Sequence, residues 1–438
     1  MSFTAIILAA GKGSRMKSSL SKPLHKVAGF EMISWVIDAA RSAGAEPIIP
    51  VISDDTPDLA SFLSGYSIAI QKNQNGTADA VMAALPHIKN RDQPILVLYA
   101  DTPFINKDIM CELLNNIKSG SDICVLGFNA ENPSGYGRLV TSCTGSLDAI
   151  IEDSEASASQ KMITNVNSGI MAFNGSIIEE TIQKITPSNS KQEYFLTDIV
   201  SVGSKNNLSV DYILTDKEHV IGINNLAQLA IAEYVAQNNL RRKAMLSGVT
   251  MIAPETVFLQ KDTIFGQDVI IEPNVVIAGG VSIASNCHIK SFCHLEKCSI
   301  GEGNIIGPFA RIRPDTITSQ NVKIGNFVEV KKSTLGEGAK VNHLSYVGDT
   351  HIGDNANIGA GTITCNYDGY RKYETKIGNG AFIGSNTALV APVIIGDNAI
   401  IGAGSTITQD VPNAGLSLSR SEQTIIPSGA EKVNNKRK

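Results

Sequence analysis

Along residues 1 to about 226, short runs of β-branched and aliphatic residues alternate with stretches in which apolar residues recur every three or four positions. The amphipathic stretches predict helices such as 31–43, which stops at Gly44, and 77–85, which stops before Pro86. The short runs predict strands at 4–9, 47–52, 94–100, 122–128 and 168–173. This alternation predicts an α/β domain with a mostly parallel sheet, whose ligands bind at the carboxyl ends of the strands.

After about residue 250 the pattern changes to a repeat of six, in which an aliphatic residue precedes a glycine. Most spacings between these pairs are multiples of six, which predicts a parallel β-helix with three six-residue faces in each coil. The periodicity does not determine the handedness of the coil. The longest break, between Gly359 and Gly378, predicts an excursion at 362–376, and such excursions often carry binding residues. The glycines of the pairs are Gly301, Gly307, Gly325, Gly336, Gly348, Gly353, Gly359, Gly378, Gly384, Gly396 and Gly402.

Between the two patterns, residues 226–246 contain neither proline nor glycine, and Gly248 follows. This predicts a helix of ~30 Å that acts as a connecting arm. The sequence therefore predicts three parts: an N-terminal domain at 1–226, a helical linker at 227–247 and a β-helix domain at 248–438.

The composition restricts the class of protein. The 438 residues suggest two or three domains, and 43% hydrophobic with 18% charged residues exclude a disordered chain. A net charge of -5 does not indicate an overall basic surface that would bind nucleic acid or membrane, so any anion site must be local. The seven cysteines include no C-x-x-C motif, which favours reduced thiols and a cytoplasmic protein. The apolar run at 3–10 is too short to span a bilayer and continues into Gly-Lys-Gly.

A glycine-rich turn follows the first predicted strand. Gly11 and Gly13 allow an anion to approach backbone N–H groups, and Lys12, Arg15 and Lys22 add positive charge, which predicts a polyphosphate site. Two other phosphate motifs are excluded, because G-x-G-x-x-G would need glycine at position 16 and G-x-x-x-x-G-K-[ST] is absent. The alternative is a tight turn without a ligand, but it does not explain the three cations.

Asp101 directly follows the predicted strand 94–100, at the carboxyl end where a ligand site is expected. A carboxylate there suits Mg²⁺. The alternative is a helix cap before Asn106.

His343 is a candidate general base within the repeat region. An isolated histidine in a repeat is more often a polar filler, but basic residues occur in the neighbouring coils. Arg313 and Lys331 are 18 residues apart, about one coil, and should therefore stack to form a phosphate clamp. The alternative is a solvated basic face.

Several motifs occur in the order typical of sugar-1-phosphate nucleotidylyltransferases, and the N-terminal half resembles this family. The motifs are LAAGKGSRM with KPL, Gln71 with NGTA, LYADTP, GYGR, IE at 151–152, NSG, EYFLTD and GINN. Together with the repeats, the chain resembles, over nearly its whole length, a bacterial family of bifunctional N-acetylglucosamine-1-phosphate uridylyltransferases and glucosamine-1-phosphate N-acetyltransferases. The resemblance implies a Rossmann-like nucleotidyltransferase domain, a left-handed β-helix, a cytoplasmic homotrimer, and synthesis of UDP-N-acetylglucosamine for the cell envelope. It implies Mg²⁺ as the metal and UTP, acetyl-CoA and glucosamine 1-phosphate as substrates.

For uridylyl transfer, the resemblance implies that Arg15 and Lys22 are catalytic residues facing the phosphates, and that Asp101 and Asn224 hold the metal. It places the nucleotide and the amino sugar against Leu8, Ala9, Ala10, Gly11, Lys22, Gln71, Gly76, Thr77, Tyr99, Ala100, Asp101, Gly137, Glu152, Asn167 and Asn224. Ala100 departs from the family pattern, where glycine is expected, and its methyl group could crowd the nucleotide and slow the reaction.

For acetyl transfer, the resemblance implies that His343 is the base. It places the acceptor against Arg313, Lys331, Tyr346, Asn357, Asn366, Tyr367 and Lys372, and acetyl-CoA against Ala360, Asn366, Tyr367, Ser385, Ala403 and Arg420. The excursion would reach a neighbouring subunit. Two alternatives stay open: a nucleotidylyltransferase whose β-helix only assembles or regulates it, and a scaffold without activity.

Overall fold

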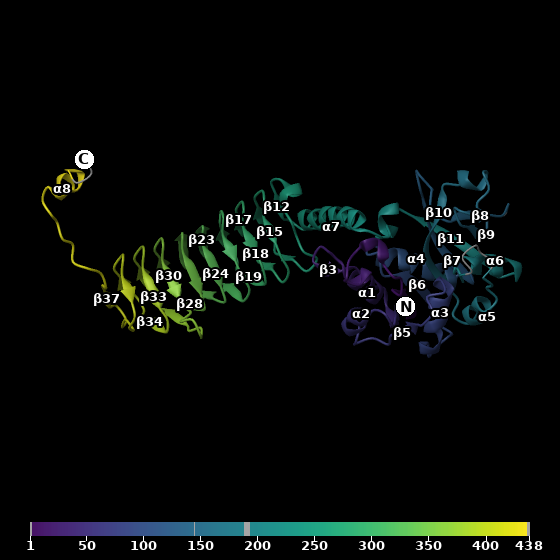
Figure 1. Ribbon diagram of the computed structural model, residues 1–438, viewed down its shortest axis with the longest axis horizontal. Helices are drawn as coiled ribbons and strands as arrows, with labels where there is room; N and C mark the ends of the chain where they lie inside the picture. Colours follow the sequence, from purple (N-terminus) through teal and green to yellow (C-terminus); the bar gives the residue numbers. More distant parts are fainter. Residues whose placement is uncertain (1, 144, 188–192, 436–438) are drawn as a thin grey trace. The chain divides into compact units, whose positions relative to one another are not determined.

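The computed structural model describes residues 2–143, 145–187 and 193–435, and divides into two compact units, Met1–Ala236 and Gln237–Lys438. Figure 1 shows the first unit in purple to teal and the second in teal to yellow. In the described parts of the chain, none of the helices is both long and apolar enough to pass through a lipid bilayer. All seven cysteines are free thiols, as expected, and burial raises the pKa of Cys293 to about 11.

The first unit is built on one twisted sheet with the strand order β11-β7-β10-β6-β1-β4-β5. Neighbours on this path run parallel, except that β10 is antiparallel to both β6 and β7. The five predicted strands are present as β1, β4, β6, β7 and β10, so the predicted α/β fold with a mostly parallel sheet is confirmed. The strands are β1 Phe3–Leu8, β4 Ala45–Ser53, β5 Ala69–Gln71, β6 Ile95–Tyr99, β7 Ile123–Asn129, β10 Asn165–Phe173 and β11 Val210–Thr215, with β8 Arg138–Thr141 and β9 Leu147–Ile151 forming a hairpin beside β10 and β2 Lys26–Val27 pairing with β3 Phe30–Glu31.

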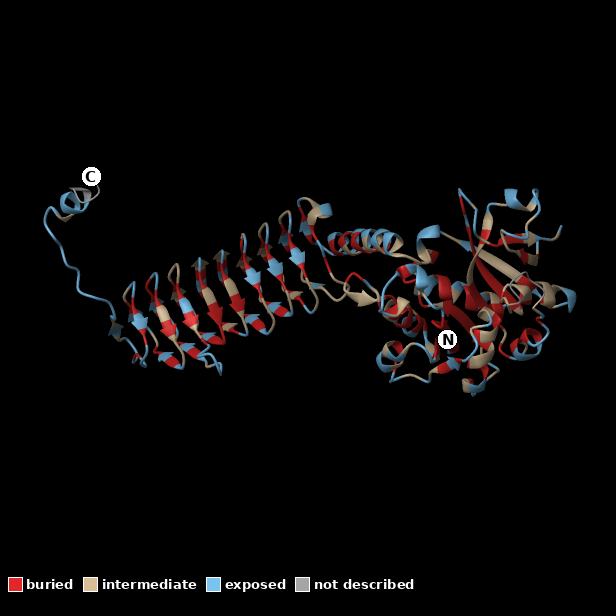
Figure 2. Cartoon of the chain, in the orientation of Figure 1, coloured by how far each residue is buried: buried red, intermediate tan, exposed pale blue. Residues whose placement is uncertain are grey.

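Helices cover both faces of this sheet. The helices are α1 Met32–Ala43, α2 Pro57–Phe62, α3 Thr77–Ala84, α4 Lys107–Lys118, α5 Ile178–Ile182 and α6 Asp198–Lys205. Helices α1, α2 and α4 pack in one core with Ile7 and Leu98, while α3, α5 and α6 pack in the other with Ile6 and Val97. Because successive strand residues point to opposite faces, the continuous apolar runs of β1 and β6 supply both cores. The buried strands stand out in Figure 2.

The second unit is a left-handed parallel β-helix, as predicted, whose three sheets run along one interior core. One sheet contains β12 Thr250–Met251, β14 Ile270–Ile271, β17 His288–Ile289, β20 Ile305–Ile306, β23 Lys323–Asn326, β26 Lys340–His343, β29 Asn357–Ile358, β32 Phe382–Ile383, β35 Ile400–Ile401 and β37 Leu416–Ser417. The second contains β13 Ile264–Phe265, β16 Ser282–Ile283, β19 Cys298–Ile300, β22 Thr316–Thr318, β25 Thr334–Leu335, β28 Thr350–Ile352, β31 Thr375–Ile377 and β34 Val393–Ile395. The third contains β15 Val276–Ile277, β18 His294–Leu295, β21 Arg311–Ile312, β24 Glu329–Lys331, β27 Tyr346–Gly348, β30 Ile363–Cys365, β33 Ala388–Val390 and β36 Thr406–Ile407.

The excursion is shorter than expected, because β30 and β31 remain in the coil and only residues 366–374 leave it. Within it, an antiparallel bridge joins Tyr367 to Lys372. A short helix, α8 Gly429–Asn435, lies near the end of the chain.

Helix α7, Leu226–Leu246, has the predicted bounds, and the division between the two units falls inside it, after Ala236. In its second half, Gln237 and Arg241 are only 4% exposed each. Arg241 donates to the Val257 carbonyl at 3.0 Å, and Gln237 exchanges two hydrogen bonds with the backbone of Leu259. The second half of the helix is therefore part of the β-helix unit and covers its first coil. The helix is more than the connecting arm that the sequence predicted.

Arg241→Met should lower the free energy of unfolding of the second unit by about 1–3 kcal/mol, because it leaves a buried carbonyl without its donor. The matched control is Arg242→Met, since Arg242 is the next residue and is exposed. Urea denaturation followed by circular dichroism would measure both. Equal stabilities for the two variants would show that the Arg241 contact is dispensable.

Candidate functional site

The residues predicted to bind nucleotide come together at the carboxyl ends of β1, β5 and β6. Ala100 N donates to the Leu8 carbonyl at 3.1 Å, which ties the segment after β6 to the end of β1. A pocket of about 480 Å³ opens there. It is lined by Leu8, Ala9, Ala10, Gly11, Lys12, Lys22, Pro23, Gln71, Gln74, Gly76, Thr77, Ala80, Tyr99, Ala100, Asp101, Glu193 and Phe195.

One wall of this pocket is held by Gln71 and Gly76. The Gln71 amide donates to the Gly76 carbonyl at 2.9 Å and to Asp79 Oδ2 at 2.7 Å. Gly76 has a φ of +111°, and a Cβ there would collide with the Tyr194 carbonyl oxygen. Only glycine therefore fits this position without moving the backbone.

Gly76→Ala should raise the KM for the nucleotide by roughly tenfold or more, since the clash with the Tyr194 carbonyl forces the segment to shift at a cost of about 1–3 kcal/mol. Gly120→Ala is a matched control, because Gly120 has a φ of +114° but has no heavy atom within 4 Å of an added Cβ. Steady-state kinetics on both variants would separate an effect on the pocket from a general effect of a strained alanine, because Gly120 does not line the pocket. Similar KM values for both would contradict a tight fit at Gly76.

A second pocket of about 360 Å³ shares Tyr99 and Asp101 with the first. Its other lining residues are Thr102, Ser134, Gly135, Tyr136, Asn167, Ser168, Val220, Gly222, Asn224 and Gln228. Of the residues that the resemblance places against the nucleotide or the amino sugar, Asn167 lines this pocket directly. Gly137 lies beside it and accepts a hydrogen bond from Asn167 N at 2.8 Å, while Glu152 accepts from the Thr197 hydroxyl at 3.3 Å.

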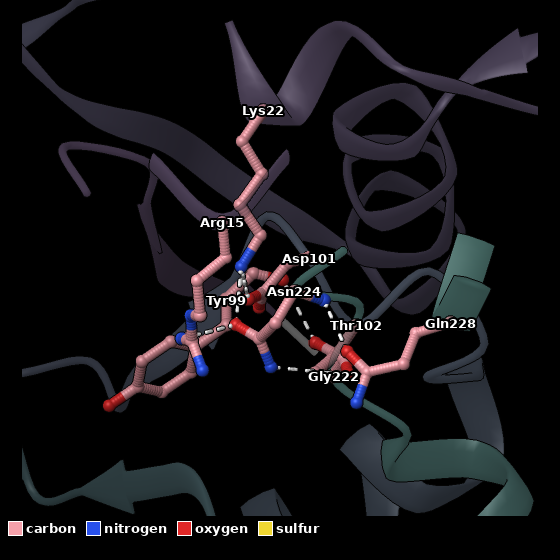
Figure 3. A network of polar contacts seen from close by, with 8 residues as sticks. All are labelled: Arg15, Lys22, Tyr99, Asp101, Thr102, Gly222, Asn224 and Gln228. Atoms are coloured by element: carbon pink, nitrogen blue, oxygen red, sulfur yellow. Dashed lines mark hydrogen bonds and ion pairs between the residues drawn. The ribbon is translucent and has the colours of Figure 1, made fainter. Parts of the chain in front are cut away.

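Two cations and two oxygen-bearing side chains meet at the junction of the two pockets (Figure 3). Lys22 Nζ lies 2.5 Å from Asp101 Oδ2 and 2.9 Å from Asn224 Oδ1. Arg15 Nη2 also reaches Asn224 Oδ1, at 2.9 Å. The four residues predicted as catalytic or metal-binding in this domain are thus one cluster.

The backbone around this cluster is fixed by a second layer of contacts. Ile223 N donates to the Asp101 carbonyl at 3.0 Å, and Asn224 N donates to Gln228 Oε1 at 2.7 Å. The alternative role of Asp101 as a helix cap is not what the structure shows, because the Asn106 side chain caps α4 by accepting from Ile109 N.

The Asp101 and Asn224 oxygens fit a magnesium ion. Both are hard oxygen ligands, and both already contact the ammonium group of Lys22. Within residues 2–143, 145–187 and 193–435, no group of three or more His, Cys, Asp or Glu side chains could hold a metal alone. This agrees with the habit of Mg²⁺ of taking one or two protein ligands and completing its shell with water and phosphate.

Tyr99 stands between the two pockets in a negative environment. Burial is the main cause that raises the pKa of its phenol, and the carboxylates of Asp101 and Glu152 raise it further. Its ring leaves no space for a Cβ at Gly169, which has a φ of +91°. The Tyr99 phenol is therefore protonated at neutral pH, and its ring packs between the two pockets.

Sequence reasoning missed several residues of these pockets. Gln74 donates to the Ala10 carbonyl at 2.9 Å, and Thr102 and Gln228 line the second pocket. Gln228 was detectable only as a polar residue near the start of the helix at 226–246. Gln74 gave no signal beyond its place before the NGTA motif.

On the β-helix, the predicted base and four of the six residues predicted to contact acetyl-CoA form one column along a corner, while Asn366 and Tyr367 lie in the excursion. The backbone N–H groups of Gly361, Asn386 and Gly404 donate to the carbonyls of His343, Ala360 and Ser385 respectively. These bonds place His343, Ala360, Ser385 and Ala403 at equivalent positions of successive coils. Arg420 extends the column by donating to the Ala403 carbonyl at 3.0 Å.

A cluster of cations lies at the far end of the third-sheet strands, where Lys331 pairs with Gly348 at the next corner of the coil. The register pairs Arg311 with Glu329, so Arg313 and Lys331 are neighbours, as the spacing of 18 predicted. Arg313 forms an ion pair with Glu329 at 2.7 Å. A contact with the Lys372 ammonium, followed by its charge and that of Arg313, lowers the pKa of Lys331. The cluster is therefore short of anions.

Asp349, which sequence reasoning missed, organises this cluster. It is 5% exposed, accepts from Asn366 Nδ2 at 2.6 Å and pairs with Lys332 at 3.1 Å. The Tyr346 hydroxyl lies over Gly348, next to Asn366. Asn366 and Lys372 from the excursion thus contact their own chain.

Two predicted residues are not in this cluster. Asn357 lies on β29 opposite Lys340, three positions before Ala360. Tyr367 is 59% exposed, and its hydroxyl donates to the Gly369 carbonyl at 2.5 Å.

Two family models match separate parts of the chain. Residues 5–166 match the MobA-like NTP transferase domain, and residues 262–297 and 374–409 match the bacterial transferase hexapeptide model with six repeats. The chain is 44% identical over 433 residues to bifunctional protein GlmU of Bartonella quintana (strain Toulouse), covering 98% of this chain and 96% of that protein. It is 45% identical to the protein of the same name from Agrobacterium fabrum, covering 97% and 95%, and 47% identical to that of Xanthobacter autotrophicus, covering 97% and 95%.

These relatives cover both units and the connection between them, not one domain alone. The chain therefore joins an NTP transferase domain to a hexapeptide-repeat transferase domain and belongs to the GlmU family of bifunctional proteins.

Proposed function

We propose that this chain first acetylates glucosamine 1-phosphate with acetyl-CoA and then transfers uridylyl from UTP to the product, which gives UDP-N-acetylglucosamine and pyrophosphate. The chain is a bifunctional enzyme with nucleotidyltransferase and acetyltransferase activities. The observation that carries the proposal is that each unit has its own set of chemically suited residues: the cluster of Arg15, Lys22, Asp101 and Asn224 in the first, and His343 with a separate cation cluster in the second.

In the first unit, the nucleotide would occupy the pocket along Gln71 and Gly76, and the sugar phosphate would occupy the pocket lined by Asn167. A sugar-phosphate oxygen attacks the α-phosphorus of UTP, and the bond to the β-phosphate oxygen breaks. Arg15 and Lys22 face the negative charge that develops on the departing pyrophosphate. Magnesium bound at Asp101 and Asn224 would neutralise phosphate charge.

In the second unit, the amine of glucosamine 1-phosphate must lose a proton before it attacks the thioester carbonyl. His343 takes that proton, the C–N bond forms, and the CoA thiolate leaves. The Arg313, Lys331 and Lys372 cations hold the sugar phosphate, which supplies the anion that this cluster lacks. The small side chains of the column from Ala360 to Ala403 leave room for an extended cofactor, and Arg420 offers it a cation.

The order of the reactions can be tested with UTP and no acetyl-CoA. The purified chain should convert N-acetylglucosamine 1-phosphate to its UDP derivative and leave glucosamine 1-phosphate nearly unchanged. Pyrophosphate release would measure both rates. Comparable rates with the two sugars would overturn the proposed order.

We also propose a cytoplasmic homotrimer assembled through the β-helix. Phe292, Phe309 and Phe327 stack on successive coils and are each 45–56% exposed. A row of exposed aromatic rings is typical of a surface that binds another protein chain. Light scattering after size exclusion should give about 140 kDa, three copies of the 46.5 kDa chain. A mass of one chain at micromolar concentration would contradict the trimer.

A further inference from the structure

A histidine acts as a base only through a ring nitrogen that carries a lone pair. In neutral imidazole, one nitrogen carries hydrogen and the other does not, and the partner of the first decides which is which. His343 is exposed, so packing does not determine its orientation. A hydrogen bond to one ring nitrogen is therefore the means by which the protein can fix both its rotation and its tautomer.

Asn326 supplies that hydrogen bond. Its Oδ1 lies 2.7 Å from His343 Nδ1. Because an amide oxygen only accepts, Nδ1 carries the hydrogen, and Nε2 is left with its lone pair. In the described part of the chain, this is the one hydrogen bond of the His343 ring.

The fold brings the two residues together with little freedom. Strands β23 and β26 pair Ile324 with Val341 and Asn326 with His343, and both aliphatic side chains are buried. At Gly325, a Cβ would collide with the backbone carbonyl of the next coil, so glycine permits the close approach of the two coils. Leu344 N then donates to the Asn326 carbonyl at 3.0 Å, directly after the pair.

We propose that Asn326 is a positioning residue for acetyl transfer, which holds His343 as the Nδ1–H tautomer so that Nε2 takes the proton of the substrate ammonium group. The inference rests on the proposed role of His343 as the base. Asn326 itself acts through His343.

The test compares Asn326→Leu, which has a similar size but no acceptor, with Asn326→Asp, which keeps an acceptor at the same place. Asn342→Leu is the matched control, because Asn342 precedes His343 on the same strand but is not the hydrogen-bond partner of its ring. In the full-length chain, Asn326→Leu should lower the kcat of acetyl transfer by about 10- to 100-fold and leave the KM for glucosamine 1-phosphate within about twofold. Asn326→Asp should restore most of the rate.

Uridylyl transfer by the same samples reports whether the first unit is folded, and circular dichroism reports whether the β-helix is folded. Nitrogen-15 spectra of the histidine rings should show hydrogen on Nδ1 of His343 in the unmodified chain and a shift toward the Nε2–H tautomer in Asn326→Leu. If Asn326→Leu keeps both the native acetyl rate and the Nδ1–H signal while His343→Ala is inactive, the role of Asn326 is wrong. If His343→Ala itself stays active, the proposed base is wrong instead.

Discussion

Asp101→Ala should reduce uridylyl transfer by at least ~100-fold, because it removes a ligand for the metal and a partner of Lys22 at the junction of the two pockets. Acetyl transfer by the same molecules should be unchanged, since His343 and the cation cluster lie in a unit with its own core. Both rates would be measured with saturating substrates, by pyrophosphate release and by CoA release.

Asp108→Ala is the matched control, because this carboxylate is exposed on the first turn of α4, a few residues away. Binding of Mn²⁺ in the presence of UTP, followed by electron paramagnetic resonance, gives a readout that does not depend on turnover. It should be lost in Asp101→Ala and kept in Asp108→Ala. Normal Mn²⁺ binding by Asp101→Ala would remove Asp101 from the metal site even if the rate fell.

His343→Ala should have the opposite effect and reduce acetyl transfer by at least ~100-fold, since a positioned general base typically contributes 10²- to 10⁴-fold. Uridylyl transfer should remain at the native rate. His351→Ala is the matched control, because His351 is exposed on β28, the strand that follows β27 in the same coil. A His343→Ala chain that acetylates at a near-normal rate would show that another group accepts the proton.

Much of the fold could be predicted from the sequence because its patterns are strong. The glycine repeat predicts the β-helix, and the uninterrupted stretch before Gly248 gives the bounds of α7. The short edge strand β5 and the terminal strand β11 gave no clear signal. That β10 runs antiparallel between β6 and β7 could not be predicted, since its apolar run looks the same in either direction.

Two functional residues of the β-helix were missed because the repeat is not strictly regular. A strict spacing of 18 identifies Arg313 and Lys331, but the coil from Asn326 to His343 has 17 residues, so counting by 18 misses that pair. Asp349 was missed because its partner Asn366 lies in the excursion, where the period fails.

The backbone conformation shows whether alanine can replace the expected glycine at position 100. Ala100 is not among the residues with positive φ, so its conformation does not require the glycine that the family pattern led us to expect. It is buried, at 2% exposure, and lines the nucleotide pocket. The methyl group is therefore compatible with the fold, and its effect on the rate stays a prediction.

We propose that one chain performs both transfers at two independent sites. The most direct test supplies the purified, unmodified chain with glucosamine 1-phosphate, acetyl-CoA and UTP, and measures CoA, pyrophosphate and UDP-N-acetylglucosamine over time. We expect CoA to appear first and the three products to reach equal amounts. Pyrophosphate production from N-acetylglucosamine 1-phosphate, with no CoA released from acetyl-CoA under any condition, would contradict the claim and leave the β-helix as an assembly or regulatory module.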